Sequence, residues 1–536
     1  MNKYIKNLLL TFLVLIFFIE KNVGMEPPTI NATDMREPVY PVYFADFFAE
    51  EGQNLIHFQW RVDGSSPAKA VITDSKGNVW GEVPFPNDRF MIERREHFPD
   101  QVLITVVDEK NRYSESVEVD LNQDVRSLWV NPEHIEPITV SKQNEEFASF
   151  CLAKSGQKFI VNGVNYCVIK TLDHDTFEPE INERPAIYDP YDAESMLRCM
   201  KRNGYNTVRV FIKTGYRGTV TLGLSGPSDT QGIYAPYMDN FLDFLSRAAK
   251  YGIYVFPCLC ENEMLSNDYF KERSGNANRQ GILFSQKGIE AKQEYLSLFL
   301  QAIKKRNPKL LDSLLGIAMQ NEFVFHCSEA PFNQLDGKYV FLDGSEYNMS
   351  DDISRRALAN AAIQYYYRAM KQTLQTNAPG LLLAEGTFAL GAVGKTEENS
   401  KGIRPIEGNL DMRYPMTAVE LMKTDIDFLD LHIYRWGFPG SGEEVFRHFT
   451  ENMKLTTQEG RQLRTKKPII MGEFGSFKEN EKTTDEAILF TKSLKNAALK
   501  DGFAGTCFWT IDCFEQKDIW NLMWENGKLL KALQSF

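Results

Sequence analysis

Eight short runs of mostly apolar residues constrain the fold of this chain more than any other feature. Each run has four to six residues, and all of them lie after residue 150. Runs of this length and character are typical of strands buried on both faces, as in a parallel sheet. They are Gly163–Tyr166, Thr207–Ile212, Tyr254–Leu259, Leu315–Met319, Leu381–Ala384, Phe428–His432, Pro468–Glu473 and Gly505–Trp509.

Helical patterns fill the intervals between these runs. The alternation predicts eight strand–helix units over residues 148–536, which is an α/β fold of the (β/α)8 TIM-barrel type. An open doubly wound sheet is the alternative, and it is disfavoured because no Gly-rich phosphate loop follows any run. The helical stretches include Ala193–Arg202, Tyr237–Lys250, Ala291–Lys305, Ile353–Thr376 and Glu486–Leu499.

The first 147 residues are organised differently. Residues 1–24 have the pattern of a secretory signal peptide, because Lys3 and Lys6 precede an apolar run, Leu8–Ile19, that is too short to span a bilayer. An uncleaved membrane anchor is the alternative. Strand patterns such as Leu55–Val62 predict a small all-β, immunoglobulin- or fibronectin-like sandwich at 38–121, preceding the barrel. Residues 122–147 are predicted to be a linker.

Composition narrows the possible partners. The formal net charge of −12 argues against binding to nucleic acid or to an anionic membrane, both of which need basic patches. Eight cysteines in 536 residues do not form a disulfide scaffold; one bridge among Cys167, Cys507 and Cys513 and buried free thiols are both open. No Cys/His spacing resembles a zinc site, so neither metal nor cofactor is predicted.

Two glutamates end predicted strands. Glu473 closes the run Pro468–Glu473, and Glu322 closes a stretch that begins at Leu315. In a barrel both would lie at the carboxyl-terminal mouth, where barrel enzymes place catalytic groups. Such a pair can protonate a glycosidic oxygen and attack the sugar or activate water. The structural alternative, two capping or salt-bridged glutamates, is less convincing for both together than for either alone.

Other strands offer polar and aromatic groups to the same mouth. Arg209 lies within a strand, where a buried arginine needs an acidic partner. His432 and Tyr434 are two residues apart, so both side chains leave one face of their strand. Asn321 precedes Glu322, and Trp509 ends the last run with a flat ring. Each has a structural alternative, such as an ion pair or a packed aromatic ring.

This set of residues resembles the (β/α)8 retaining glycosidases, and most of all glycoside hydrolase family 5, which includes cellulases and β-mannanases. The segment Phe159–Tyr166 is similar to the start of that family's barrel, and the resemblance covers roughly residues 148–536. It implies that Glu322 is the acid/base and Glu473 the nucleophile. It further implies tuning of Glu473 by Arg209 and Tyr434, and sugar binding by Asn321, His432 and Trp509.

The chain also departs from the family pattern. Phe323 stands where many members have proline, and the run Pro257–Asn262 lacks a histidine that many members carry. Contacts to sugar on that side are therefore in doubt. Glu385, at the end of the fifth strand, is a rival carboxylate, interpreted as structural or substrate-binding because it lacks the flanking pattern.

The pattern at 1–24 predicts a secreted, periplasmic or extracellular protein, and the resemblance implies an endo-acting β-glycosidase that works by double displacement on β-mannan or β-glucan. The patterns around Asp427–Tyr434 and Lys467–Gly475 are closer to β-mannanases than to cellulases. An exo-acting enzyme and a carbohydrate-binding protein on an inactive barrel are the alternatives. The expected partner is a polysaccharide or oligosaccharide, with no nucleic acid and no membrane once the signal is removed, and the expected state is a monomer.

Overall fold

The computed structural model describes residues 42–49, 55–62, 67–84, 89–93, 99, 101–108, 117–120, 128–141, 146–167, 176–180, 186–213, 224, 226–227, 229–259, 268–277, 279–435, 438–511, 516 and 518–534. The predicted signal peptide at 1–24 lies outside these residues. Within them, no helix combines the length and the apolar character needed to cross a bilayer.

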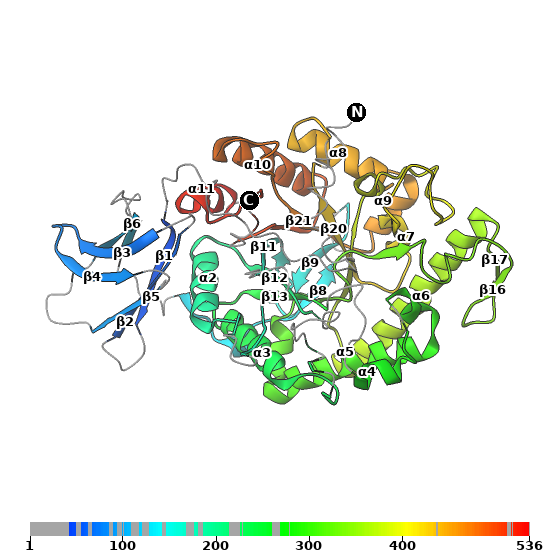
Figure 1. Ribbon diagram of the computed structural model, residues 1–536, viewed down its shortest axis with the longest axis horizontal. Helices are drawn as coiled ribbons and strands as arrows, with labels where there is room; N and C mark the ends of the chain where they lie inside the picture. The colour runs from blue at the N-terminus through cyan, green and yellow to red at the C-terminus, as the bar shows by residue number, and fades with distance from the viewer. Residues whose placement is uncertain are drawn as a thin grey trace, which may run out of the picture.

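A closed barrel of eight parallel strands forms the centre of the molecule (Figure 1). The strands follow chain order around the barrel, and the last pairs with the first. The predicted (β/α)8 TIM barrel is therefore confirmed. The strands are β11 (Val161–Tyr166), β12 (Thr207–Phe211), β13 (Tyr254–Cys258), β14 (Ile317–Ala318), β18 (Leu383–Phe388), β20 (Phe428–Ile433), β21 (Ile469–Phe474) and β22 (Gly505–Phe508).

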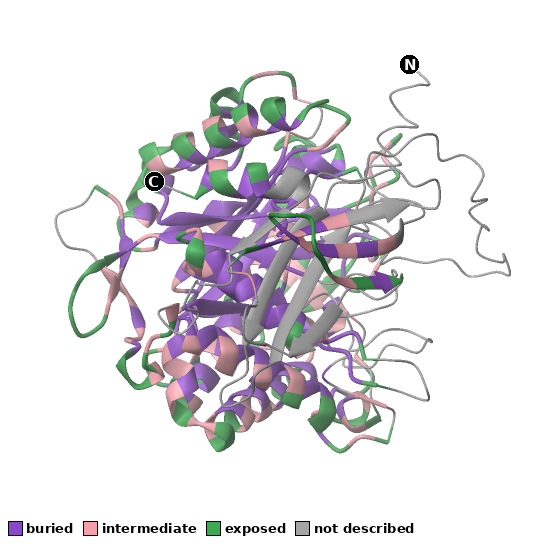
Figure 2. Cartoon of the chain, turned by 90° about the vertical axis from the view of Figure 1, so that its left-hand side faces the viewer, coloured by how far each residue is buried: buried purple, intermediate pink, exposed green. Residues whose placement is uncertain are grey.

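Helices surround the barrel, and their inner faces join its strands in one buried core (Figure 2). Their starts are encoded locally: Asp189 caps the helix that begins at Pro190, and Thr483 and Glu486 form a capping box. All five stretches predicted to be helical are helical. The described helices are α2 (Pro190–Arg202), α3 (Ala235–Lys250), α4 (Asp268–Arg273), α5 (Gln286–Arg306), α6 (Asp352–Asn377), α7 (Ala418–Met422), α8 (Gly442–Asn452), α9 (Gln458–Arg464), α10 (Thr484–Lys500) and α11 (Trp524–Leu533).

A small antiparallel sheet closes the amino-terminal end of the barrel. It contains β8 (Ile138–Ser141), β9 (Ser149–Leu152) and β10 (Lys158–Phe159). The Phe150 ring on β9 lies 5.2 Å from that of Phe428 at the start of β20. Part of the predicted linker at 122–147 thus belongs to the barrel, because the short helix η2 (Pro132–His134) and β8 place the apolar side chains of Ile135 and Ile138 in its core.

The carboxyl-terminal helix α11 is fastened to this same end of the barrel. Asn162, at the start of β11, donates from Nδ2 to the carbonyl oxygen of Gln534 at 2.9 Å. The buried Lys495 of α10 donates to the Asn162 side chain at 3.0 Å and to the Leu533 carbonyl at 2.6 Å. The Tyr205 hydroxyl donates to the Leu530 carbonyl at 2.9 Å. The first strand and the last helix therefore hold each other in place.

Seven antiparallel strands lie beside the barrel, with β1 next to α11 (Figure 1). They form two sheets, as the sandwich predicted at 38–121 requires. That the sheets pack as an immunoglobulin- or fibronectin-like sandwich stays a prediction. One sheet has the order β1 (Val42–Ala49), β2 (Leu55–Val62), β5 (Arg89–Glu93), and the other has β4 (Val79–Pro84), β3 (Pro67–Asp74), β6 (Gln101–Asp108), β7 (Val117–Asp120).

A long excursion follows β14 and is held by one buried arginine. It contains β15 (Val324–His326), which pairs with β19 (Arg413–Pro415), and the hairpin β16 (Lys338–Val340) to β17 (Glu346–Asn348). The Arg355 guanidinium of α6 donates to backbone carbonyls of this excursion and of residues 402–403: Phe332, Gln334, Met349, Gly402 and Ile403. The excursion is therefore a fixed part of the barrel mouth.

A substitution at Gly386 can test how closely the segment after β14 approaches β18. A Cβ atom at Gly386 would lie 1.9 Å from the Asn321 carbonyl oxygen, next to Glu322. Gly386→Ala is expected to lower stability by about 1–3 kcal/mol through overpacking, measured by denaturant unfolding. Gly391→Ala is the matched control, because a Cβ there meets nothing within 4 Å. Equal stability of the two variants would contradict this description.

Candidate active site

The buried arginine of β12 organises the carboxyl-terminal half of the barrel interior. Arg209 has no exposed surface. Its guanidinium makes four hydrogen bonds and one further contact, all to residues on other strands or on the segment after β14. Nε donates to Asp430 Oδ2 at 2.9 Å, Nη1 to Glu473 Oε1 at 2.9 Å and Asn165 Oδ1 at 3.1 Å, and Nη2 to Asn321 Oδ1 at 2.8 Å, while Nη2 lies 3.2 Å from His432 Nε2.

The two candidate catalytic carboxylates lie close together above this arginine. Glu473, in β21, accepts from Arg209 at Oε1 and from the Tyr434 hydroxyl at Oε2, at 3.0 Å. Glu322, after β14, has Oε1 2.9 Å from His432 Nδ1. One oxygen of Glu322 and one of Glu473 lie within 4.8 Å of each other. His432 Nδ1 lies between them, 2.9 Å from Glu322 Oε1 and 3.6 Å from Glu473 Oε2. Both carboxylates are buried, at 8% and 3% exposure.

The Glu473 and Glu322 carboxyl groups lie close enough for the charge of one to affect the other. Burial raises the pKa of Glu473, and the neighbouring carboxylates Glu322 and Asp430 raise it further, whereas His432 and Arg209 lower it; the net shift is upward. Glu473 receives hydrogen bonds from both the guanidinium and the Tyr434 hydroxyl, and both stabilise its charged form.

His432 lies between negative groups on three sides. Burial lowers the pKa of its imidazole, but the carboxylates of Glu473, Asp430 and Glu322 overcome burial and raise it to about 10. The 3.2 Å contact between Nε2 and Arg209 favours the neutral ring, since an N–H there would face another N–H. The charges decide in favour of the cation: three carboxyl groups surround two basic groups, and a neutral ring would leave the buried cluster more negative.

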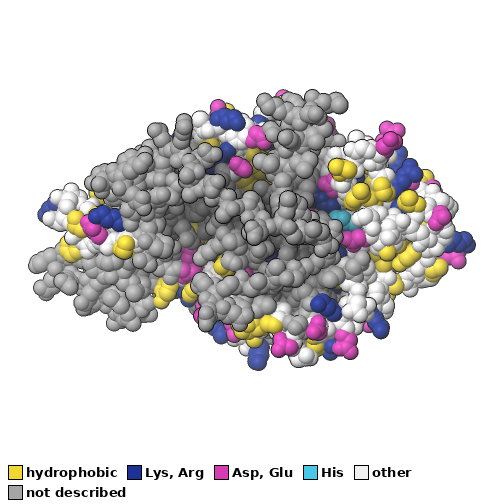
Figure 3. Space-filling model, viewed as in Figure 1, with side chains coloured by type: hydrophobic (Ala, Val, Ile, Leu, Met, Phe, Trp, Pro, Cys, Tyr) yellow, Lys and Arg dark blue, Asp and Glu magenta, His cyan; other side chains and the backbone are white. Residues whose placement is uncertain are grey.

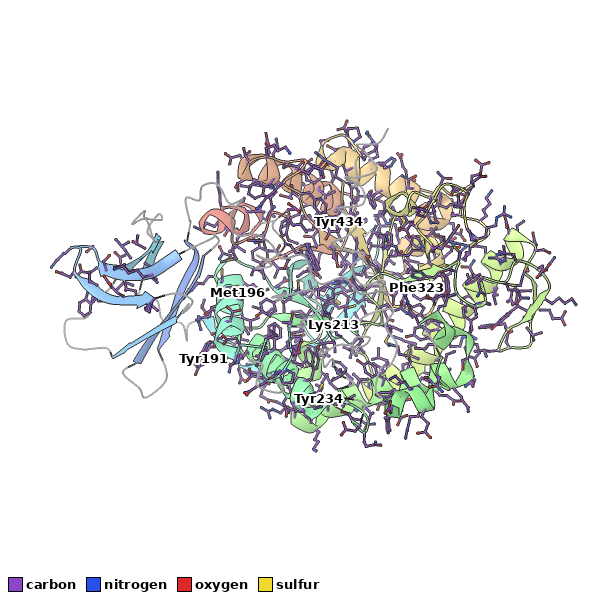
Figure 4. The ribbon with its side chains drawn as sticks, viewed as in Figure 1. Tyr191, Met196, Lys213, Tyr234, Phe323 and Tyr434 are labelled. Carbon is purple, nitrogen blue, oxygen red and sulfur yellow. The ribbon has the colours of Figure 1, made fainter. Side chains whose placement is uncertain are left out.

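Trp509 lies next to this network and outside it. It follows β22 directly, and its backbone N–H donates to the Phe474 carbonyl at 2.8 Å, beside Glu473. Its indole Nε1 donates to Gln516 at 2.9 Å, and the Phe211 ring meets it edge-on at 5.5 Å. The ring is only partly buried. Figure 4 labels Tyr434, which follows β20, and Phe323, which comes after β14; both side chains are buried.

The structure thus brings together all seven site residues predicted from the sequence. Six are linked by hydrogen bonds or ion pairs, and Trp509 adjoins them. Two members of the network, Asn165 and Asp430, were not singled out from the sequence. A signal existed for Asp430: it lies two residues before His432, so its side chain shares the face of His432 and Tyr434. An acid inside an otherwise apolar strand needs a partner.

Glu385, the rival carboxylate, lies elsewhere. It is fully buried, and burial raises its pKa well above the usual value. Its electrostatic neighbours include Tyr366 and Tyr367 of α6. The adjacent Gly386 instead faces the barrel interior, where the space for a Cβ is taken by the Asn321 carbonyl and His432. Strand alternation therefore directs Glu385 toward the helix layer, away from Glu322 and Glu473.

The three groups Glu322, His432 and Glu473 are near enough to one another to contact a single cation. Their present partners leave little need for one. Glu473 already pairs with Arg209 at 2.9 Å, and Glu322 with His432 at 2.9 Å. A divalent metal would meet the guanidinium and the imidazolium at close range and be repelled by both. The donor set therefore fits hydrogen bonding among its own members better than a metal.

Fold and site together define a (β/α)8 barrel with two facing carboxylates at its carboxyl-terminal mouth, the class to which retaining glycosidases belong. Endo-β-mannanases are among the solved structures that are similar to this chain. One is from Rhizomucor miehei (15% identity, TM-score 0.49, covering 74% of this chain and 97% of that chain).

Two further similar structures are a β-mannanase from the blue mussel Mytilus edulis (17% identity, TM-score 0.43, 75% and 96% covered) and an exo-β-1,4-mannosidase from Opitutaceae bacterium strain TAV5 (16% identity, TM-score 0.43, 67% and 53% covered). No protein-family model matches the sequence, and no curated protein does. At these identities the likeness concerns the fold.

The charge on His432 can be tested directly. A folded pKa of about 10, against about 6.5 in the unfolded chain, means that His432 adds stability that is fully present below pH 6.5 and is lost as pH rises through about 10. With ¹⁵N-labelled histidine, the His432 signals, assigned by their loss in His432→Asn, are expected to be those of an imidazolium at pH 7–8. Signals of a neutral ring at pH 7 would contradict the charge assignment.

Proposed function

We propose that this protein is a retaining β-glycosidase, with Glu473 as nucleophile and Glu322 as general acid/base. The observation that supports this most is the separation of their oxygens, which lie within 4.8 Å of each other. Retaining enzymes hold the two carboxyl groups about 5–5.5 Å apart, whereas inverting enzymes need about 6.5–9.5 Å to admit a water molecule. The spacing favours direct attack on the sugar.

In the first step, a Glu473 oxygen attacks the anomeric carbon while Glu322 gives its proton to the leaving oxygen. The bond between the anomeric carbon and the leaving oxygen breaks, and a glycosyl ester of Glu473 forms. Arg209 and Tyr434 keep Glu473 ionised and aim it before attack. As the carboxylate loses its charge, the guanidinium keeps its second carboxylate partner, Asp430.

In the second step, Glu322 acts as a base. It takes a proton from a water molecule, whose oxygen attacks the anomeric carbon and releases Glu473 as a carboxylate. His432, 2.9 Å from Glu322, donates from Nδ1 to the ionised form. Asn321 and Trp509 adjoin the pair and are proposed to bind sugar hydroxyls and to stack on the ring, respectively. Two inversions at the anomeric carbon give net retention.

The proposed substrate is a β-linked polysaccharide, β-mannan or β-glucan, and the proposed location is outside the cytoplasm. Figure 3 shows acidic and basic side chains interspersed over the described part of one face, which suits a neutral polymer better than a polyanion. The proposal of export comes from the residue pattern at 1–24. The sizes of the reaction products will show whether the enzyme cleaves within the polysaccharide chain or at its end.

Removing either carboxylate is expected to abolish turnover. Glu473→Gln and Glu322→Gln should each lower kcat/KM at least 10²–10⁴-fold on the substrate cleaved best, measured on β-mannan, β-glucan, xylan and aryl β-glycosides. Glu385→Gln is the matched control, since this buried glutamate faces the helices, and it should retain activity.

Three results would count against the proposal. A Glu473→Gln variant with full activity would remove the nucleophile. A Glu385→Gln variant as inactive as the other two would show loss of structure rather than of chemistry. Binding of a glycan by the parent protein without cleavage of any substrate would favour the carbohydrate-binding alternative.

The stereochemistry of the first product gives an independent test. Proton NMR during the first minutes of hydrolysis is expected to show the β-anomer before mutarotation, because two displacements restore the configuration. An initial α-anomer would mean single displacement, and the short Glu322–Glu473 separation would then need another explanation.

A further inference from the structure

A third carboxylate, Asp430 of β20, lies beneath the catalytic pair. It has no exposed surface, and its Oδ1 has no hydrogen-bond partner among the described residues. The neighbouring strand β21 makes room for it, since a Cβ at Gly472 would lie only 1.5 Å from Oδ1. Burying a carboxylate with one oxygen unpaired is costly. A chain that needed only a filled barrel could place an apolar residue there.

Oδ2 of Asp430 connects the two basic groups of the site. It accepts from Arg209 Nε at 2.9 Å and lies 3.6 Å from His432 Nε2. Arg209 in turn holds Glu473, and His432 Nδ1 contacts Glu322. Asp430 therefore reaches both catalytic carboxylates through one intermediate residue each, and it has no exposed surface of its own.

We propose that Asp430 is a positioning residue: it fixes the orientation of the Arg209 guanidinium and keeps His432 positively charged, and through them it sets the charge states of Glu473 and Glu322. The charged groups that face His432 are Glu322 after β14, Glu473 on β21, Asp430 on β20 and Arg209 on β12. Arg209 opposes the imidazolium, and the Asp430 and Glu473 carboxylates favour it, joined by Glu322 whenever that group is ionised.

Among these carboxylates, Asp430 is the one whose charge does not change during double displacement. Glu473 becomes an uncharged ester, and Glu322 gives up and regains a proton. This part of the inference rests on the proposed function. With Asp430 present, His432 remains an imidazolium throughout the cycle and can stabilise Glu322 when it ionises. Without Asp430, the one negative charge that the pair carries would move from Glu473 to Glu322 as the ester forms, and no fixed carboxylate would remain beside the ring.

The first test does not depend on activity. In Asp430→Asn, which preserves the shape of the side chain, the ¹⁵N signals of His432 are expected to change from imidazolium to neutral ring at a lower pH than in the parent. Asp427→Asn is the matched control. Asp427 lies just before the same strand at its amino-terminal end, where it accepts from the Leu383 N–H at 2.7 Å, and its loss should leave His432 unchanged.

The second test uses turnover. Asp430→Asn should lower kcat by about 100-fold through misplacement of Glu473, with a smaller change in KM, and should move the alkaline limb of the pH profile to lower pH. Asp427→Asn should keep the parent profile. A parent protein that cleaves nothing would refute the proposed function, and the NMR result would still decide the role of Asp430.

Three outcomes would overturn the proposal. The first is an unchanged His432 titration in a folded Asp430→Asn variant. The second is a neutral His432 at pH 7 in the parent protein, which needs no variant and so remains decisive if Asp430→Asn does not fold. The third is a parent-like pH profile with reduced stability alone, which would make Asp430 purely structural.

Discussion

A guanidinium with no access to water is the constraint on which the rest of this barrel depends. Removing one partner from a buried ion pair costs about 3–5 kcal/mol, because the other charge is left uncompensated. Arg209 therefore needs every one of its neighbours, and those neighbours come from β11, β20, β21 and the segment after β14. The arginine becomes stable only when strands distant in sequence have closed around it, so the same interactions that build the site specify the register of the barrel.

Close approach of backbone and side chains makes this arrangement possible. Gly472 leaves the space that the Asp430 carboxylate fills, and Gly386 leaves the space for the Asn321 carbonyl beside Glu322. A methyl group at either position would displace a member of the network. The positions of the two catalytic carboxylates are thus determined by packing behind them as well as by the hydrogen bonds that they accept.

Much of the fold and of the site follows from local patterns in the sequence. The eight apolar runs and the helical stretches between them predict the barrel, because strand and helix periodicities are local. Glu322 and Glu473 stand out as acids at strand ends, and His432 and Tyr434 share a face by alternation. The partnership of Arg209 with Asp430 is not local: the two are 221 residues apart, and their contact depends on which strands face each other across the closed barrel. The burial of Ile135 and Ile138 is not local either. Their stretch of sequence has the character of a linker, and the barrel end that buries them is built from residues later in the chain.

The fastening of α11 to β11 has a consequence for the synthesis of the protein. Asn162 and Gln534 are separated by 372 residues, yet each helps to hold the other. A chain that leaves the ribosome from its amino terminus exposes β11 long before its final partners, β22 and α11, exist. Contacts so distant in sequence make folding slow, so the apolar surface of a half-made barrel has to be shielded until the last helix arrives. A nascent chain cut short before α11 would leave the first strand without its last contacts.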